Sequence, residues 1–336
     1  MITSNKFIRA AYGAALRTYL AENAHIEKLI DFGDLPVFLD VSAYPCIVLT
    51  VKGTSGPTRY LRVHSLDFDS LSGLVETAAA DLPPDAISGA NWRLMDADEY
   101  AILKKMERES VPLKAWLGDR KINYGIKTGF NKAFFIDEKT RTRLIAEDPK
   151  SAELIKPLVV GKDIKRYEIE YKRRHLIWTY VGVPIDKYSA IFEHLKQFQP
   201  QLERRWDKGD HWWELRHCNY YADFEKPKIM YQDISEHGSF AYDSDGLFAN
   251  NTVYFFNVFS RFLSGMLNSK LIEYWFRRVG AEYRGGYLRF FTQYMERLPI
   301  RRIAFVTPKE ERARLVEEGK NLYRNALTKL RSEAEE

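Results

Sequence analysis

The pattern of apolar and polar positions sets a short N-terminal segment apart from the rest of the chain. Apolar residues follow helical spacing through residues 5–22 and predict an amphipathic helix. An apolar run at residues 26–32 predicts a strand, residues 36–38 a turn, and residues 45–51 a buried strand. So few elements cannot complete a doubly wound domain. Residues 1–55 therefore predict an α/β fragment, either the end of a larger sheet or a terminal appendage.

The remaining residues mix predicted strands and helices. The predicted helices lie at residues 67–81, 96–107, 137–145, 152–159, 187–206 and 260–279. The predicted strands lie at residues 60–63, 175–180, 227–234 and 251–256. We expect a linking region over residues 56–120, a main domain over 121–303 and a charged C-terminal helix over 304–336. Together these patterns predict an α+β fold.

A polar segment that contains a glycine, and that a second glycine precedes, is the first candidate for ligand contact. We expect a tight strand-turn-strand over residues 126–132, because the glycines permit backbone angles that other residues resist. Its side chains suit contacts to phosphates and base edges. They are Lys127, Thr128, Asn131 and Lys132. An ordinary hairpin with a solvated tip would show the same pattern.

Two further segments combine glycine with cations. The turn at residues 162–167 carries Lys162, Lys165 and Arg166, a composition suited to phosphate contacts that set the register on a duplex. The loop at residues 283–289 contains a glycine pair and carries Arg284, Tyr287 and Arg289. Arginine suits a guanine edge or a bidentate phosphate contact. Each segment is equally compatible with a solvated turn.

Aromatic and amide side chains extend the set of candidate contacts. Trp206, Trp212 and Trp213 lie among charged residues, and Arg216 follows them. Interleaved aromatic and basic residues can stack on bases, although a tryptophan is more often a packing anchor. Gln232 falls near the end of a predicted strand, where an amide can read an adenine edge or satisfy a turn.

Composition narrows the class of protein. The 336 residues are 45% hydrophobic, which is sufficient for two packed domains. A net charge of +5 permits a polyanionic partner. Cys46 and Cys218 lack metal-ligand spacing and predict neither a zinc site nor a disulfide framework. No apolar run reaches membrane-span length and the first residues do not form a signal-peptide core, so we expect a soluble, cytoplasmic protein.

Three segments in order resemble the TaqI-like C-terminal specificity domain, which follows the adenine methyltransferase domain in type IIG restriction-modification enzymes and related phage-defence methyltransferases. The segments lie at residues 126–135, 154–167 and 266–271, and their centres read Lys127-Thr128-Gly129-Phe130-Asn131, Gly161-Lys162-Asp163-Ile164-Lys165 and Leu267-Asn268-Ser269. The similarity runs from about Trp92 to Ile300. It implies a target-recognition domain that binds duplex DNA sequence-specifically. Residues 126–132 and 283–289 would supply specificity, and residues 162–167 would position the backbone.

The N-terminal segment carries a second resemblance. It is similar to the closing portion of the methyltransferase domain in the same enzymes, through Asn5-Lys6-Phe7, Tyr12-Gly13, Leu16-Arg17, Ile30-Asp31-Phe32-Gly33-Asp34 and Val37-Phe38. A complete catalytic domain would carry a glycine-rich cofactor loop and an Asn-Pro-Pro-Tyr motif that holds the flipped adenine. The sequence has neither. We therefore expect a truncated product or expressed fragment with no catalytic residue and no cofactor of its own, although S-adenosylmethionine is expected for a full-length parent.

Other functions compete with this interpretation. Asp163 with Glu170 and Lys172 has the composition of a metal-dependent nuclease centre, although so short a pattern recurs by chance. An RNA-binding or protein-scaffold module is the third interpretation. We expect no metal site, and we expect double-stranded DNA and the parent's missing methyltransferase and nuclease domains as partners. An open apolar sheet edge also predicts self-association.

Overall fold

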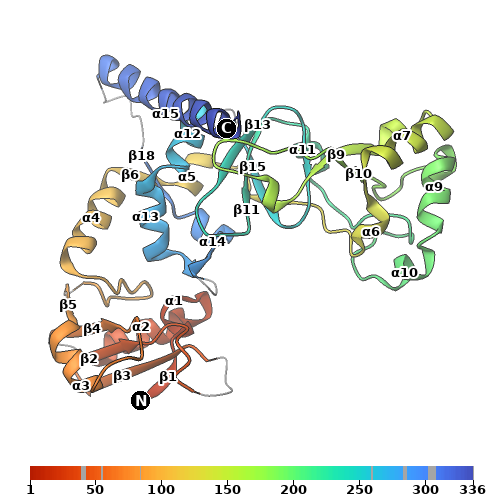
Figure 1. The fold of residues 1–336 in the computed structure, drawn as a ribbon. Helices are drawn as coiled ribbons and strands as arrows, with labels where there is room; N and C mark the ends of the chain where they lie inside the picture. The colour runs from red at the N-terminus through yellow and green to blue at the C-terminus, as the bar shows by residue number, and fades with distance from the viewer. Residues whose placement is uncertain are drawn as a thin grey trace. The chain divides into compact units, whose positions relative to one another are not determined.

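A computed structural model gives the fold of the chain. It describes residues 1–38, 43–53, 56–83, 85–258, 260–282, 286–301 and 308–335, so Arg284 lies outside the described residues. The chain divides into two compact units. The first comprises Met1–Leu113 and Tyr274–Arg302, and the second comprises Lys114–Glu273 and Ile303–Glu336. Figure 1 labels the helices and strands of both units.

A five-stranded sheet organises the first unit. In spatial order its strands are β1 (Ile2–Ser4), β3 (Pro45–Lys52), β2 (Ala24–Asp31), β4 (Thr58–Arg62) and β5 (Ala80–Leu82). β2 pairs antiparallel with β3 and parallel with β4. The predicted strands at 26–32 and 45–51 are confirmed and belong to one sheet. Residues beyond 55, expected to link two domains, supply two further strands to that sheet.

The helix predicted over residues 5–22 is interrupted. It consists of α1 (Lys6–Arg9), the 3-10 turn η1 (Ala11–Gly13) and α2 (Ala14–Asn23). A side chain at Gly13 would overlap the carbonyl oxygen of Phe7. The buried guanidinium of Arg17 donates to the carbonyl oxygens of Phe7 and Ala10, which fixes the bend. Periodicity alone missed this break because the apolar spacing continues across it.

Asp31 connects the end of β2 to three other segments. Its Oδ1 accepts hydrogen bonds from the Asn5 side chain at 2.6 Å and from the Gly33 N–H at 2.9 Å. Its Oδ2 forms an ion pair with Arg62 at the end of β4. Asn5, Asp31 and Gly33 all belong to the segments that resemble a methyltransferase, and the structure joins them in one network.

The other elements of the first unit are short strands and helices. Val75 of α3 (Leu71–Ala78) packs with Ile30, Phe32, Leu61 and Val63 in a small core. The remaining elements are α4 (Ala97–Arg108), β6 (Ser110–Pro112), β16 (Ala281–Glu282), β17 (Leu288–Arg289), α14 (Thr292–Met295) and β18 (Pro299–Arg301). β6 pairs with β18 and β16 pairs with β17, both antiparallel. The helix predicted at 96–107 is confirmed by α4.

Two four-stranded sheets form the centre of the second unit. The first has the order β14 (Phe248–Ala249), β9 (Ile155–Val159), β10 (Arg174–Ile177) and β8 (Phe135–Ile136). The second has the order β13 (Phe240–Asp243), β11 (Lys228–Gln232), β15 (Val253–Asn257) and β7 (Asn123–Tyr124). Residues of both sheets belong to one buried core, among them Leu158, Leu176, Met230 and Phe255.

The helices of this part of the chain are mostly short, apart from α15 with 27 residues. They are α5 (Leu113–Leu117), α6 (Asn131–Phe134), α7 (Glu138–Glu147), α8 (Ser151–Leu154), α9 (Ser189–Lys196), α10 (Gln199–Arg204), α11 (Tyr221–Phe224), α12 (Arg261–Leu267), α13 (Lys270–Val279) and α15 (Lys309–Glu335). α13 carries the division between the units at Glu273 and Tyr274. The mixture of helices with several small sheets confirms the predicted α+β class.

Three helix predictions beyond residue 150 were wrong in their extent. Residues 152–159 change from α8 to β9 at Ile155, because Pro157 offers no N–H to a helix and the flanking β-branched residues favour a strand. The helix expected over 187–206 is split into α9 and α10, and Pro200 lies in the first turn of α10. The helix expected over 260–279 breaks into α12 and α13 around Asn268.

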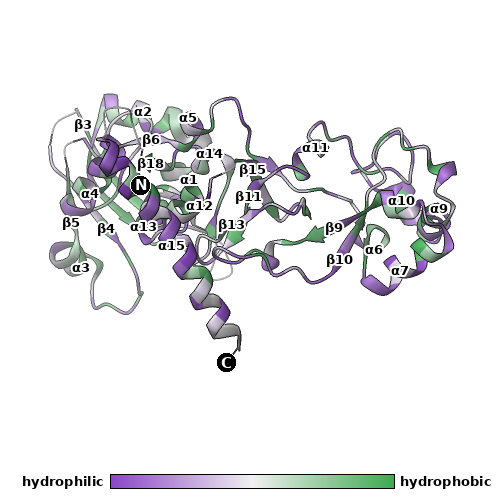
Figure 2. Cartoon of the chain, turned by 90° about the horizontal axis from the view of Figure 1, so that it is seen from above, coloured by the Kyte–Doolittle hydropathy of each residue, from purple (hydrophilic) through white to green (hydrophobic). Residues whose placement is uncertain are grey.

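The C-terminal helix α15 packs against α12. Both helices carry a glycine where they meet, and a Cβ on Gly265 would lie 2.8 Å from the carbonyl oxygen of Gly319. Only glycine permits so close an approach of two helix backbones. Figure 2 shows hydrophilic and hydrophobic residues alternating along α15, as an amphipathic packing helix requires. Over the described ranges, no helix is both long enough and apolar enough to span a bilayer.

Candidate nucleic-acid interface

The predicted basic turn lies in the second unit and begins with the 3-10 turn η2 (Gly161–Asp163). Lys162 and Lys165 are exposed, whereas Asp163 and Tyr167 are buried. Within the described part of the chain, neither lysine forms an ion pair. We call residues 161–167 the basic turn. It presents two cations to solvent from a backbone that is otherwise buried.

The first half of the basic turn is bonded to two strands. The Oδ2 of Asp163 accepts hydrogen bonds from the Val160 N–H and from the Arg174 guanidinium, both at 2.9 Å. The N–H of Gly161 donates to the Thr252 hydroxyl at 2.7 Å. A Cβ on Gly161 would lie 3.0 Å from the carbonyl oxygen of Thr252, so glycine suits this close contact. These bonds fix the backbone that carries Lys162.

Gln232 supports the middle of the basic turn. Its Nε2 donates to the carbonyl oxygen of Ile164 at 2.7 Å. The amide predicted as a possible reader of base edges therefore holds the turn through this bond. The structure thus brings Gln232 together with Lys162, Lys165 and Arg166, and gives it a positioning role.

Tyr167 ends the basic turn in a strained backbone conformation. Its φ is +72°, which a residue with a side chain rarely adopts. Its N–H donates to the carbonyl oxygen of Phe240 at 3.0 Å, and the Tyr323 hydroxyl donates to its carbonyl oxygen at 3.3 Å. The rings of Tyr167 and Tyr323 pack edge to face with centroids 5.7 Å apart. These contacts hold the conformation, which costs on the order of 1–3 kcal/mol.

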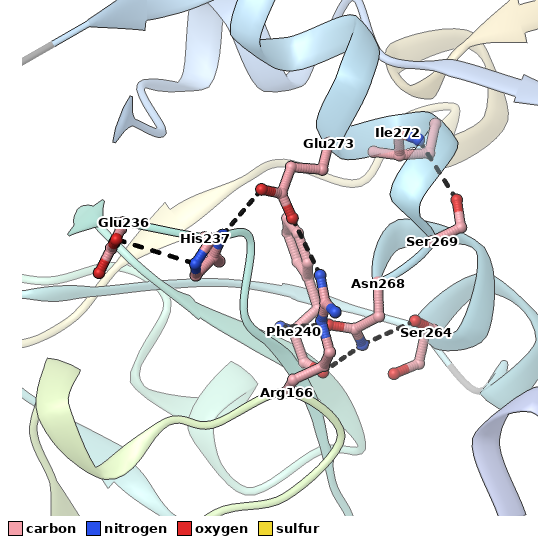
Figure 3. Close-up of polar contacts among 9 residues, drawn as sticks. All are labelled: Arg166, Glu236, His237, Phe240, Ser264, Asn268, Ser269, Ile272 and Glu273. Atoms are coloured by element: carbon pink, nitrogen blue, oxygen red, sulfur yellow. Dashed lines mark hydrogen bonds and ion pairs between the residues drawn. The ribbon is translucent and has the colours of Figure 1, made fainter. Parts of the chain in front are cut away.

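Arg166 turns toward a carboxylate on α13. Figure 3 shows Glu273 between Arg166 and His237. The Glu273 Oε2 lies 3.0 Å from the Arg166 guanidinium, and the Glu273 Oε1 lies 2.8 Å from the His237 Nδ1. The charge of Arg166 is therefore offset inside the protein, unlike the charges of Lys162 and Lys165.

Asn268 connects the same region to the break between α12 and α13. Its Nδ2 donates to the carbonyl oxygens of Phe240 at 2.6 Å and Ser264 at 2.9 Å, and its Oδ1 accepts from the Phe240 N–H at 3.0 Å (Figure 3). Phe240 is also the residue that accepts from Tyr167. The sequence analysis did not assign a role to Asn268 or Glu273. An amide inside the motif at 266–271 was the available signal for Asn268.

The segment at 126–132 is not a strand-turn-strand hairpin. β7 and β8, which flank it, belong to different sheets, and α6 begins at Asn131. Thr128 is only 1% exposed. Its hydroxyl donates to the Asn131 Oδ1 at 2.6 Å and accepts from the Phe130 N–H at 3.2 Å. A turn that leads into the short helix α6 takes the place of the expected hairpin, so Thr128 shapes the turn while Asn131 and Lys132 remain exposed.

Lys127 and Arg216, 89 residues apart by their numbers, meet at one carboxylate. Asp207 lies 3.0 Å from the Lys127 ammonium and 3.6 Å from the Arg216 guanidinium. Both cations remain 49% exposed. We call Lys127, Asp207 and Arg216 the Asp207 cluster. The cluster joins the turn that contains Lys127 to the segment that contains Arg216, which were separate candidates in the sequence.

A buried arginine that the sequence analysis missed holds these segments together. Arg205 is 7% exposed and donates to the carbonyl oxygens of Thr128, Asp207, Trp212 and Glu214. Burial lowers the pKa of its guanidinium to about 10, so it is still a cation at neutral pH. Arg205 thus fixes the turn at 126–132 against residues 205–214.

The three tryptophans of this region differ sharply. Trp212 and Trp213 pack against the main core and against Phe192. Trp206 is 98% exposed. Each of the three was predicted either to stack on bases or, more often, to anchor the core; Trp212 and Trp213 pack against the core, and Trp206 does not.

The remaining predicted contacts belong to the first unit. Tyr287 is 44% exposed. Arg289 lies on β17, with its guanidinium over the Phe291 ring at 4.1 Å from the centroid. Arg284, which we predicted to read a base, lies outside the described ranges.

In the structure, Asp163, Glu170 and Lys172 do not form the nuclease centre that was considered as an alternative. The carboxylate of Asp163 is fully buried and paired with Arg174, so it is not open to a metal ion. Glu170 and Lys172 form an exposed ion pair at 3.3 Å. Among the described residues, no group of three or more His, Cys, Asp or Glu side chains is arranged to hold a metal.

Comparison with known families agrees with both resemblances. Residues 156–300 match the TaqI-like C-terminal specificity domain, and residues 1–38 match the Eco57I restriction-modification methylase. The chain is therefore similar to a restriction-modification specificity domain over residues 156–300 and to a methylase over residues 1–38. These matches confirm the two resemblances predicted from the sequence.

The curated relatives are longer than this chain. Type II methyltransferase M.PaeR7I of Pseudomonas aeruginosa is 27% identical over 345 residues, which cover 94% of this chain and 57% of that protein. M.XhoI of Xanthomonas vasicola is 22% identical, and the match covers 89% of this chain and 58% of that protein. The restriction enzyme and methyltransferase RM.Eco57I of Escherichia coli is 23% identical, and the match covers 97% of this chain and 37% of that protein. The chain thus spans little more than half the length of the first two relatives.

A solved structure supports the fold. The type IIL restriction-modification enzyme MmeI, determined in complex with DNA, matches 100% of this chain and 42% of its own chain with a TM-score of 0.57. The two sequences are 12% identical, so the match concerns the fold.

Proposed function

We propose that this chain supplies DNA target recognition to a type II restriction-modification methyltransferase. The observation that carries the proposal is the basic turn, where Lys162 and Lys165 have no ion-pair partner among the described residues and project from a hydrogen-bonded backbone. A lysine ammonium held in one place can neutralise a phosphate and set the register of a protein on a duplex. These contacts would be independent of base sequence.

Base contacts would come from the other exposed residues. Asn131 and Lys132 at the start of α6, with Lys127 and Arg216 of the Asp207 cluster, form a second polar surface of the second unit. Arg284, Tyr287 and Arg289 of the first unit complete the proposed contacts. Thr128 and Gln232 would act through the backbone that they hold. In this assignment residues 121–303 form the recognition domain and residues 1–55 the methyltransferase remnant.

The proposed parent enzyme would methylate adenine with S-adenosylmethionine. The sequence contains neither a glycine-rich cofactor loop after an N-terminal strand nor an Asn-Pro-Pro-Tyr motif, so no residue of this chain is assigned to the cofactor or to methyl transfer. The partners would be duplex DNA and the parent's catalytic domains, in the cytoplasm, in defence against phage. Self-association through the edges of the five-stranded sheet is also proposed, although β1 and β5 are only three residues long.

Equilibrium binding to a labelled DNA duplex, without divalent metal or cofactor, tests the proposal. We expect binding that weakens by orders of magnitude between about 50 and 200 mM salt. A single-stranded RNA of the same length should compete poorly. Absence of duplex binding at low salt, or metal-dependent cleavage of the duplex by the chain, would contradict the proposal.

A further inference from the structure

Trp206 is almost completely exposed, although its neighbours in sequence are not. It lies two residues after the end of α10 and is 98% exposed, whereas Arg205, which lies between them, is 7% exposed. A tryptophan usually buries a large apolar surface and is enriched at interfaces rather than in water. Trp206 contributes little to the folded core, so an external contact is the simplest reason for its position.

The backbone on both sides of Trp206 is fixed. Arg205 is bonded to four carbonyl oxygens, including those of Thr128 and Asp207. The carbonyl oxygen of Trp206 itself accepts from the Lys208 N–H at 3.1 Å. The indole ring is therefore carried on a held turn and is not part of a loose loop, so less conformational freedom is lost when it binds.

A buried glutamate closes the same loop from the other side. Glu214 is 1% exposed and accepts hydrogen bonds from the Gly182 N–H at 2.8 Å and the His211 N–H at 2.9 Å. A Cβ on Gly209 would lie 2.6 Å from the Glu214 Oε2, so the loop packs tightly there. The loop that carries Trp206 is thus held in place by hydrogen bonds, as the basic turn is.

Basic residues flank Trp206 in the sequence. The sequence around it reads Arg204-Arg205-Trp206-Asp207-Lys208, with three basic residues and one acid. Lys127 and Arg216 reach the same Asp207 and stay half exposed. A flat apolar ring among cations fits a ligand that combines flat apolar faces with negative charge. Nucleobases joined by phosphates have this chemistry.

We propose that Trp206 stacks on a nucleobase that is unstacked in the bound duplex, with Lys127, Arg204 and Arg216 facing the flanking phosphates. The inference rests on the proposed function and adds a contact by stacking to the contacts by charge and hydrogen bonding. Stacking is tolerant of sequence, so Trp206 contributes affinity to many duplexes rather than choosing among them.

The test is binding of the full chain to a labelled duplex in wild-type form and as Trp206→Phe, Trp206→Leu and Trp206→Ala. Stacking predicts that Trp206→Ala loses affinity roughly 5- to 150-fold, that Trp206→Leu loses nearly as much, and that Trp206→Phe retains most of it. The melting temperature should not fall in any variant, because the ring is exposed in the folded protein. Acrylamide should quench one tryptophan less in the DNA complex of the wild type, and this protection should be absent from Trp206→Phe.

Tyr19 provides a control because it is another exposed aromatic residue, 61% exposed on α2 of the first unit. Tyr19→Ala should bind as the wild type does, and an equal loss there would overturn the inference. If the wild type binds no duplex, the proposed function fails first. If the wild type binds and Trp206→Ala binds equally well, or Trp206→Leu matches Trp206→Phe, the stacking inference alone is overturned.

Discussion

The guanidinium of Arg166 lies 3.0 Å from the carboxylate of Glu273, although 107 residues separate them in the sequence. The other oxygen of Glu273 contacts His237. In the same turn, Lys162 and Lys165 have no ion-pair partner among the described residues. Three cations that look equivalent in sequence are therefore in two different electrostatic situations.

This difference predicts that substitution of the two lysines and of Arg166 will change the salt dependence of DNA binding to different extents. Lys162→Ala and Lys165→Ala should each reduce the slope of log affinity against log salt by about 0.9, because each would remove one phosphate contact. Arg166→Ala should leave the slope nearly unchanged, since Glu273 already offsets its charge. Binding to one duplex across a salt series measures the slopes. Lys139→Ala, on the exposed side of α7, is the control, and a slope lowered equally in all four variants would contradict the division.

Substitution of Asp163 should change DNA affinity in the direction opposite to the one expected from its charge alone. Removal of a negative charge near DNA would normally strengthen binding, but Asp163 holds Val160 and Arg174 and so positions Lys162. Asp163→Asn should therefore weaken DNA binding several-fold and destabilise the chain by about 1–3 kcal/mol. Glu170→Gln is the matched control because it removes an exposed carboxylate from the next part of the chain. Tighter binding by Asp163→Asn would show that the pair does not position the turn.

Lys228 and Asp243 form a buried ion pair between β11 and β13, with side chains 0% and 1% exposed. Burial, opposed by Asp243, lowers the pKa of the Lys228 ammonium. Lys228→Met would leave the Asp243 carboxylate buried without its cation and should destabilise the chain by about 3–5 kcal/mol. Urea unfolding measures the loss. Lys196→Met removes an exposed pair with Glu193 and should change stability by less than about 1 kcal/mol. Equal losses of stability in Lys228→Met and Lys196→Met would contradict the conclusion that burial makes the Lys228–Asp243 pair the more important of the two.

His194 predicts how stability depends on pH. Its Nε2 lies 3.1 Å from the carbonyl oxygen of Ala133 in α6, and burial lowers its pKa below the usual value. The unfolded chain then binds a proton at a higher pH than the folded chain, so stability should fall as pH decreases below about 6.5. His194→Gln keeps a donor for Ala133 and should weaken this dependence.

His175 also has a pKa lowered by burial, so the His194 variant removes only part of the effect. Unfolding in urea at several pH values between about 7.5 and 5.5 provides the measurement. The same pH dependence in the variant and the wild type would contradict the role of His194.

Local patterns predicted most of the longer strands but few of the short strands and few helix ends. The run at 45–51 was recognisable because a buried strand is apolar throughout, and it forms β3. The break at Asn268 was not recognisable, because the side chain that ends α12 bonds to Phe240, a residue remote in sequence. The strand over 155–159 was taken as a helix although Pro157 was a visible signal against it.

The candidate site was predictable in composition and not in arrangement. Glycine and cations identified the basic turn, since both requirements are local. The ion-pair partners of its charged residues, Arg174 for Asp163 and Glu273 for Arg166, are set by tertiary packing. The same holds for Trp206, whose exposure depends on Arg205 being buried beside it.

Selection from a randomised duplex library, with the bound DNA sequenced, tests the central claim most directly. The wild-type chain would be incubated without metal or cofactor at a salt concentration where binding is partial. The account predicts enrichment of a short motif, because a target-recognition module reads bases in addition to phosphates. Unenriched recovery of all sequences by a chain that binds DNA would contradict the claim that this chain alone carries the sequence choice.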